Sequence, residues 1–181
     1  NMADVGVRPG IAFSDSRPDR FLLPDYVFVP TRGYGYARQI LREKFVDWKD
    51  RIPTAFWRGG TTGSPNFGND WRTLDRYRLV EIATHSPDKA LFDVGFSNIV
   101  QVQDPAFAET VKARNMLLGP IPWQDWGRYR YLIDIDGNSS PWSNLFQKLL
   151  TGSPVLKIES RRGYRQWFYD ELKPWENYVP I

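Results

Sequence analysis

The sequence lacks cysteine altogether and contains a single histidine, His85. Without thiols the chain can form neither a disulfide framework nor a zinc–thiolate site. A lone histidine outside any serine–histidine–aspartate arrangement gives no support for a catalytic triad, and we expect it to be a surface residue. Disulfide-stabilised folds and zinc–thiolate modules are therefore excluded, and triad hydrolases find no support.

Long apolar runs and a strong charge of one sign are also missing. No run approaches the apolar length of a membrane-spanning helix, and the N-terminus lacks the apolar core of a signal peptide. The 24 basic and 21 acidic residues give a net charge of only +3, which is weak for a protein that binds nucleic acid. We therefore expect no transmembrane segment and no nucleic-acid partner.

The chain is long enough for one domain, and prolines punctuate its start. Its 181 residues fit a single domain with an added arm. Residues 1–36 are expected to form an irregular N-terminal arm, because prolines interrupt them and only residues 26–29 have the character of a strand. Residues 37–181 are expected to form the domain.

Strand-like and helix-like segments alternate through residues 37–181. The expected strands cover residues 55–58, 91–94, 131–135 and 154–158. The expected helices cover residues 38–50, 74–84, 104–115, 141–150 and 164–172. Because strands that alternate with helices pack as a parallel sheet between two helical layers, the sequence predicts an α/β fold with a Rossmann-like, doubly wound parallel sheet.

The first expected strand ends in an arginine, and a loop of glycines and threonines follows it. These residues are Arg58, Gly59, Gly60, Thr61 and Thr62. Glycines let main-chain N–H groups approach a ligand, threonines add hydroxyl donors, and the guanidinium supplies a cation. Ligands of open α/β sheets bind outside the carboxyl ends of the strands, so this loop is expected to bind an anion such as a diphosphate. The alternative is a tight turn with a surface arginine.

Further arginines follow in the next expected helix. Arg76 lies one helical turn into it, so its guanidinium could reach the same anion. Arg72 and Arg78 are expected on a solvated helix face.

A second candidate segment opens the helix after the strand at residues 131–135. It contains Gly137, Ser139, Ser140, Trp142 and Ser143. At the start of a helix, hydroxyl and free N–H groups point to where a phosphate can be held. The alternative is plain N-capping by serine.

Asp134 and Asp136 close the strand before this segment. Alternation along a strand places both carboxylates on one face, and Mg²⁺ takes one or two carboxylates together with substrate phosphates. Hydrogen bonding to the following turn is the favoured role, because aspartate commonly stabilises turns. We therefore expect no metal ion here.

Five motifs in a fixed order resemble a known family. They are Phe56–Gly59, Arg76 with Leu79, Tyr129–Asp134 with Gly137, Gly152–Lys157, and Leu172–Trp175 followed by Tyr178–Pro180. Together they resemble glycosyltransferase family 90, which includes capsule proteins, bacterial lipopolysaccharide glycosyltransferases and protein O-glucosyltransferases. The resemblance covers residues 13–181.

The resemblance implies a fold, an activity and a site. The chain would be the C-terminal, donor-binding half of a GT-B enzyme that transfers a sugar from a nucleotide sugar, commonly UDP-linked, to a hydroxyl of a glycan or lipopolysaccharide acceptor. Arg58 and the loop Gly59–Thr62 would hold the donor diphosphate with Arg76 in support, and Gly137–Asn144 would hold the nucleotide and the transferred sugar. No metal or other cofactor is expected. The resemblance to bacterial members implies a cytoplasmic location, with peripheral association of the full-length enzyme with the inner membrane as a further option.

The sequence departs from the family at two points. Eukaryotic members carry a Ser-aromatic-Arg sequence at the helix start, whereas Pro141–Asn144 holds no arginine and Trp142 would supply the aromatic ring. The family's catalytic aspartate belongs to an N-terminal domain that is expected to lie outside this chain. No catalytic residue is therefore assigned, and the chain alone is expected to transfer sugar inefficiently.

A binding module is the second interpretation. The 8 Trp, 9 Tyr and 11 Phe, interleaved with arginines, would suit stacking of carbohydrate or single-stranded nucleic acid without catalysis. The basic residues do not form a run, and the strand–helix alternation differs from that of small all-β binders. The glycosyltransferase interpretation is preferred for these reasons.

Overall fold

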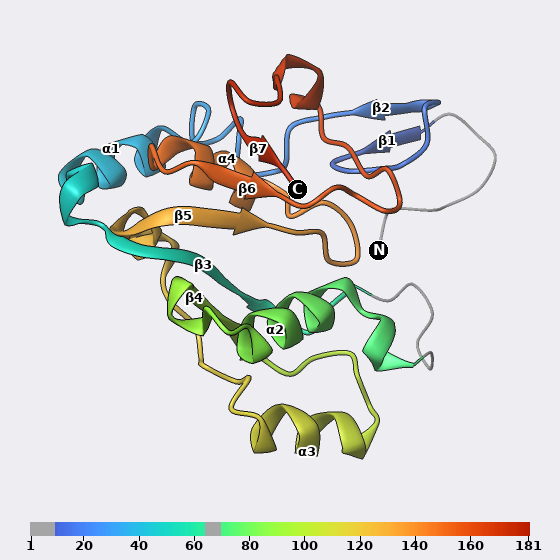
Figure 1. The fold of residues 1–181 in the computed structure, drawn as a ribbon. Coiled ribbons are helices and arrows are strands. Elements are labelled where there is room, and N and C mark those ends of the chain that lie inside the picture. The colour runs from blue at the N-terminus through green and yellow to red at the C-terminus, as the bar shows by residue number, and fades with distance from the viewer. Residues whose placement is uncertain (1–9, 64–69) are drawn as a thin grey trace.

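A computed structural model describes residues 10–63 and 70–181, and a five-stranded parallel sheet lies at its centre (Figure 1). Its order is β4-β3-β5-β6-β7. The strands are β3 (Ile52–Gly60), β4 (Phe92–Asn98), β5 (Tyr129–Asp134), β6 (Val155–Lys157) and β7 (Val179–Pro180). The first of these strands in the chain, β3, pairs with β4 on one side and with β5 on the other, so Phe56 is in register with both Asp93 and Leu132.

Helices cover both faces of this sheet, which confirms the doubly wound, Rossmann-like arrangement (Figure 1). The α-helices are α1 (Gly35–Glu43), α2 (Asp75–His85), α3 (Pro105–Ala113) and α4 (Ser143–Leu150). Figure 1 shows α2 and α3 below the sheet and α1 and α4 above it. The 3₁₀ helices are η1 (Trp48–Asp50), η2 (Trp71–Thr73), η3 (Lys89–Leu91), η4 (Trp123–Arg128) and η5 (Tyr169–Glu171).

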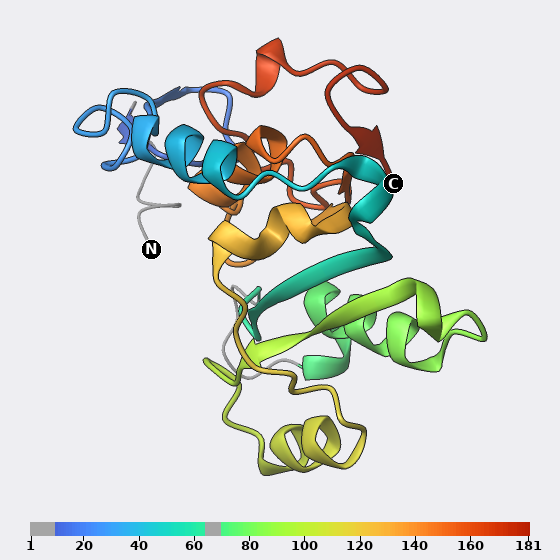
Figure 2. The same cartoon turned by 90° about the vertical axis from the view of Figure 1, so that its left-hand side faces the viewer.

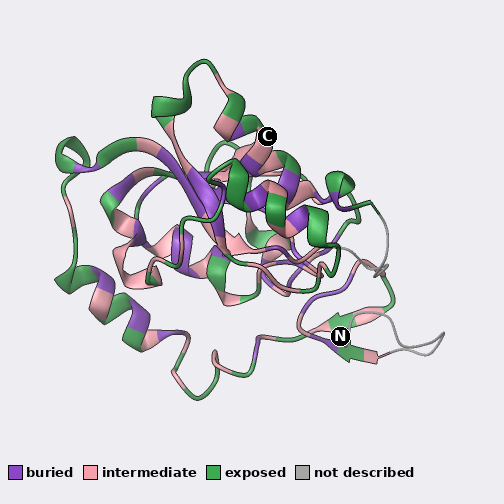
Figure 3. Ribbon diagram, turned by 90° about the horizontal axis from the view of Figure 1, so that it is seen from below, coloured by how far each residue is buried: buried purple, intermediate pink, exposed green. Residues whose placement is uncertain are grey.

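The alternation of side chains along β3 divides the core between the two faces. Ala55 and Trp57 join the large apolar cluster formed with α2 and α3. Phe56 points to the other face, where its ring stacks on Tyr129 with the ring centroids 4.1 Å apart. Figure 3 shows the buried residues concentrated along the central strands, with exposed residues on the outer sides of the helices. Burial on both faces explains why the centre of the strand, Ala55–Trp57, is continuously apolar.

Residues 10–36 of the expected N-terminal arm pack on the α1–α4 side of the sheet in both Figure 1 and Figure 2, and residues 1–9 lie outside the described residues. The arm contains two short parallel strands, β1 (Gly10–Ala12) and β2 (Arg20–Leu22). The expected strand at residues 26–29 is wrong. The chain turns there instead, because the Asp25 carboxylate and carbonyl accept from N–H groups one turn ahead. The division of the chain at residue 36 stays a prediction.

Two expected helices differ from the structure for physical reasons. The helix expected at 38–50 ends at Glu43, and Trp48 beyond it lies 46% exposed with its ring edge against Tyr131. The helix expected at 164–172 is reduced to η5, because the main chain of Arg165 pairs with that of Asp15 in the arm. An extended segment held by the arm cannot also close helical hydrogen bonds.

Candidate functional site

The neighbouring ends of β3 and β5 form the point where the sheet order reverses. Chain connections leave this point in opposite directions, so the loops after the two strands separate and leave a crevice at their carboxyl ends. The loop after β3 and the loop after β5 meet at its base, where the N–H of Gly63 donates to Oδ1 of Asn138 at 3.1 Å. Ligands of open α/β sheets occupy this position.

Arg76 of α2 connects the two loops through hydrogen bonds to both. Its Nε donates to the carbonyl of Asp136 at 2.8 Å, and its Nη1 donates to the carbonyl of Gly60 at 3.0 Å and to Oγ1 of Thr62 at 2.7 Å. Burial lowers the pKa of Arg76 to about 10, with Asp134 and Asp136 opposing that shift. The side chain is therefore a cation at neutral pH. Within residues 10–63 and 70–181 it forms no ion pair with a carboxylate.

Gly137 is the point of closest approach between the loops. A Cβ atom here would lie 2.6 Å from Oγ1 of Thr62 and 2.8 Å from Nη2 of Arg76. Real Cβ atoms essentially never show such distances, so any other residue here would have to displace the Thr62 and Arg76 side chains from their hydrogen bonds.

An open hollow of about 370 Å³ lies over this junction. Its walls are Thr62, Arg76 and the segment Gly137–Asn144, which leads into the first turn of α4. The size suits a small-molecule ligand, and the free N–H groups at the start of a helix favour an anionic one. The structure thus brings together seven of the residues expected from sequence: Thr62, Arg76, Gly137, Ser139, Ser140, Trp142 and Ser143.

Ser140 also borders the hollow, but its polar groups are already engaged. Its N–H and its hydroxyl both bond to Oγ of Ser14 in the arm, at 3.2 and 2.8 Å, and it is 2% exposed. The Ser139 hydroxyl is engaged as well, because it donates to the carbonyl of Ser140 at 3.2 Å and accepts from the indole N–H of Trp142 at 3.1 Å. Ser140 therefore anchors the loop to the arm, whereas Ser139 is less buried and holds Trp142.

Trp142 forms an aromatic rim beside the hollow. Its φ of +50° is uncommon for a residue with a side chain, and strain of this kind is typical of functional loops. The ring is held edge-on by Phe13 and Tyr26 of the arm, with centroid distances of 5.7 and 6.4 Å. It remains 41% exposed, so one side is open to a ligand.

Arg58 lies outside the hollow, which differs from the expectation that it leads the anion contact. Alternation along β3 places it on the face of Phe56, whereas Arg76 lies against Trp57 on the opposite face. Its guanidinium pairs with the carboxylate of Asp93 and donates to the Asp93 carbonyl at 2.8 Å.

Most other residues of the glycine–threonine loop make structural contacts within the domain. Gly60 contributes its carbonyl to Arg76, and a Cβ atom on Gly59 would lie 2.5 Å from the ring of Trp57. Thr61 is 1% exposed and its Oγ1 bonds to both main-chain groups of Val100. Only Thr62 of this loop reaches the hollow.

Asp134 is a buried structural carboxylate. Nζ of Lys148 lies 2.7 Å from one of its oxygens and Nζ of Lys157 lies 3.3 Å from the other. Burial alone would raise the pKa of Asp134, but the two ammonium groups hold it below its ordinary value. With both oxygens engaged, this side chain is poorly placed to bind a metal ion.

Asp136 differs from Asp134 in its surroundings. Burial raises the pKa of its carboxyl group, and one of its oxygens has no hydrogen-bond partner within the part of the chain that the structure describes. Those described residues also contain no group of three or more histidine, cysteine, aspartate or glutamate side chains that could hold a metal ion.

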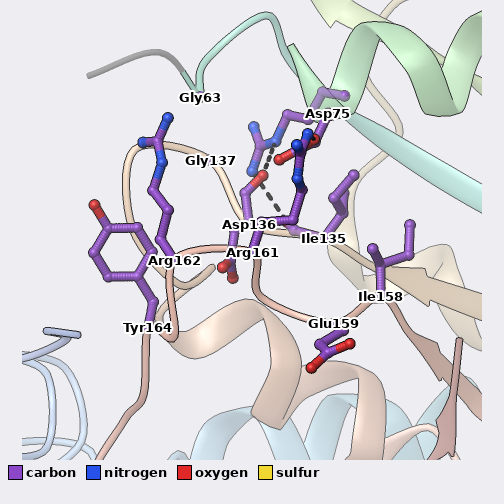
Figure 4. A pocket seen from close by; sticks show the side chains of 11 residues that line it. Gly63, Asp75, Ile135, Asp136, Gly137, Ile158, Glu159, Arg161, Arg162 and Tyr164 are labelled. Atoms are coloured by element: carbon purple, nitrogen blue, oxygen red, sulfur yellow. Dashed lines mark hydrogen bonds and ion pairs between the residues drawn. The ribbon is translucent and has the colours of Figure 1, made fainter. Parts of the chain in front are cut away.

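A narrow pocket of about 20 Å³ adjoins the hollow and shares Arg76 and Gly137 with it (Figure 4). Arg162 and Tyr164, from the segment after β6, form its outer wall. Sequence patterns did not indicate Arg162, Tyr164 or Ser14 as site residues, because their roles depend on contacts between distant segments.

The remaining expectations concern surface residues. Arg72 and Arg78 are exposed as expected, and Arg72 pairs with Asp70 at 3.0 Å. His85 is also exposed. Within the described residues, no helix has the length and apolar character that crossing a membrane requires.

The amino-acid sequence of this chain is similar to a family model and to several known proteins. The model of Glycosyl transferase family 90 matches residues 31–181. Protein O-glucosyltransferase 3 of Rattus norvegicus is 32% identical over 134 residues, which cover 74% of this chain and 22% of that protein. O-glucosyltransferase rumi of Drosophila pseudoobscura pseudoobscura is 23% identical over 188 residues, which cover 96% of this chain and 41% of that protein.

A viral protein matches the same share of this chain as the rat protein does. Uncharacterized protein 035R of Invertebrate iridescent virus 3 is 29% identical over 148 residues, covering 74% of this chain and 12% of that protein. The chain therefore spans less than half the length of each of these relatives. Since the family model covers most of the sequence, the chain belongs to glycosyltransferase family 90.

Proposed function

We propose that this chain forms the donor-binding half of a glycosyltransferase that takes a nucleotide sugar, UDP-linked, and transfers the sugar to an acceptor hydroxyl. The observation that carries the proposal is the hollow at the reversal point of the sheet, where Arg76, Thr62 and the start of α4 converge. Membership of the family supports the reaction class.

The hollow offers stabilisation for a departing diphosphate without a metal ion. The start of α4 carries the positive end of the helix dipole, and Arg76 adds a cation fixed by four carbonyl or hydroxyl partners. When the bond between the sugar and the diphosphate breaks, the electron pair moves to the leaving phosphate oxygen. Fixed donors and positive charge lower the energy of that state because they need no reorganisation.

The proton of the acceptor hydroxyl requires a base, and two of the carboxylates near the sheet, Asp93 and Asp134, are poorly suited to that role. Asp134 is paired with two lysines and Asp93 with Arg58, so both carboxylates are already engaged in ion pairs. We therefore propose that the base lies outside this chain.

The acceptor and the location stay proposals. The name of the rat relative, Protein O-glucosyltransferase 3, favours transfer to a protein hydroxyl, so a protein acceptor should be tested before a glycan or lipopolysaccharide. The matched relatives are eukaryotic and viral, and the bacterial source and cytoplasmic location remain expectations from sequence alone.

Calorimetry with UDP tests the donor site. We expect the wild-type chain to bind UDP, and Arg76→Ala to weaken binding at least tenfold, since a charged hydrogen-bond partner contributes about 1.5–3 kcal/mol. Ser143→Ala is a milder variant at the helix start. Arg78→Ala, an exposed arginine on the same helix, is the matched control. A wild-type chain that binds no nucleotide would favour the non-catalytic binding module instead.

A further inference from the structure

The hollow contains less available positive charge than a diphosphate requires. The segment Gly137–Asn144 holds no basic residue. Arg76 is the cation among the residues that line the hollow. Its guanidinium already donates four hydrogen bonds, to Gly60, Thr62, Ile135 and Asp136. A diphosphate carries at least two negative charges, so its binding calls for a second cation that can approach from outside.

Arg162 is placed to supply that cation. It lines the narrow pocket together with Gly63 and Gly137, and that pocket shares Arg76 with the hollow. In Figure 4 the Arg162 side chain extends from the segment after β6 toward the end of the pocket where Gly63 and Gly137 lie.

Arg162 differs from the neighbouring arginines, Arg161 and Arg165, because each of those two lies beside a carboxylate. Arg161 pairs with Asp75 at 2.9 Å, and Arg165 lies 3.6 Å from Asp170. Arg162 is exposed and forms no hydrogen bond or ion pair with any residue in the ranges 10–63 and 70–181. Its guanidinium can therefore move to a ligand without breaking an existing contact.

We propose that Arg162 is a phosphate-binding residue that pairs with the diphosphate of the donor from the side opposite α4. The inference rests on the proposed donor site. A guanidinium can donate two parallel hydrogen bonds to phosphate oxygens, which an ammonium group cannot reproduce. Arg76 and the start of α4 form the fixed wall of the site, and Arg162 forms its movable wall.

Nucleotide titrations of four variants test this role. Arg162→Ala should weaken the binding of UDP about tenfold, while the affinity for uridine, which has no phosphate, stays unchanged. Arg162→Lys should recover part of the loss. Arg161→Ala and Arg165→Ala remove the same charge from neighbouring positions, and both should bind UDP as the wild type does. The loss in Arg162→Ala should shrink in high salt, because exposed ion pairs are screened.

The outcomes separate the two proposals. If the wild type binds UDP and Arg162→Ala binds it equally well, or loses uridine to the same degree, the role of Arg162 is refuted while the donor site stands. An equal loss in Arg161→Ala would also refute it, because general charge would then explain the effect. A wild type that binds neither UDP nor uridine refutes the donor site and the role of Arg162 together. Melting temperatures of all variants establish that each is folded.

Discussion

Gly137 is the residue at which the smallest change should have the largest effect on the site. The Cβ atom of Gly137→Ala would meet Thr62 and Arg76 at distances that no real Cβ contact shows. The two loops must then separate, which should cost about 1–3 kcal/mol of stability and weaken UDP binding. Thermal melting and calorimetry measure the two effects. Gly35→Ala is the control, because a Cβ atom there has nothing within 4 Å, and equal effects in both variants would contradict the explanation.

Protonation of Asp134 in acid should weaken the central sheet. Its folded pKa lies below its ordinary value, so it contributes stability above about pH 4 that is lost as pH falls through the folded pKa. In Asp134→Asn the ammonium groups of Lys148 and Lys157 lose their partner, and we expect a loss of about 3–5 kcal/mol at pH 7.

Denaturant unfolding between pH 3 and pH 7 measures this contribution. The stability of the wild type should fall steeply in acid, and that of Asp134→Asn should fall less. Asp125→Asn, which breaks the exposed pair with Lys44, should stay within about 1 kcal/mol of the wild type. An equally steep acid dependence in Asp134→Asn would show that other carboxylates cause it.

At the scale of elements, the arm and the β5 loop act as one unit. Ser14 satisfies both polar groups of Ser140, and Phe13 and Tyr26 hold the ring of Trp142. Ser14→Ala leaves a buried N–H without its partner, which should cost about 1–3 kcal/mol and loosen the loop. We expect UDP binding to weaken several-fold in calorimetry. Ser97→Ala, which loses only an exposed bond to Asn98, should bind normally; unchanged binding in Ser14→Ala would mean that the arm is separate from the site.

The sequence allowed the central elements to be predicted, because their patterns are local. The apolar run of β3, the run of β5 and the amphipathic α2 appear in the structure where they were expected, within a few residues at each end. The segment after β5 was indicated as a ligand loop by its glycine and serines, and it does line the hollow.

Contacts between distant segments account for what could not be predicted. The position of Arg58 depends on which face of β3 is opposite α2, and that is decided by packing in three dimensions. The local sequence around Arg165 predicts a helix, but in the structure the main chain of Arg165 pairs with that of Asp15 in the arm. No local sequence pattern distinguishes Arg162 from the arginines beside it. Its proposed role follows from two features of the folded structure: it forms no ion pair among the described residues, and it lines the narrow pocket.

At the scale of the whole molecule, we expect the chain to bind a nucleotide but to transfer sugar slowly by itself. A general base typically contributes 10²–10⁴-fold to such a reaction, and Asp93 and Asp134 are both engaged in ion pairs. UDP release in the presence of acceptor peptides measures transfer, and a longer protein that includes the remaining length of the relatives is the comparison. Equal turnover by the two proteins would require a base within this chain, with Asp136 as the first candidate.

The order of strands also has a consequence for how the protein folds. Because β3 meets β4 early in the chain and β5 only much later, the β3–α2–β4 unit can assemble while β5, which precedes the loop with Gly137, is still unpaired. Pairing over long sequence separations is the slow part of folding. The hollow needs both loops, so partly folded molecules would have no complete ligand site. Nucleotide would therefore bind only fully folded chains and stabilise them by mass action, which makes ligand binding a measure of completed folding.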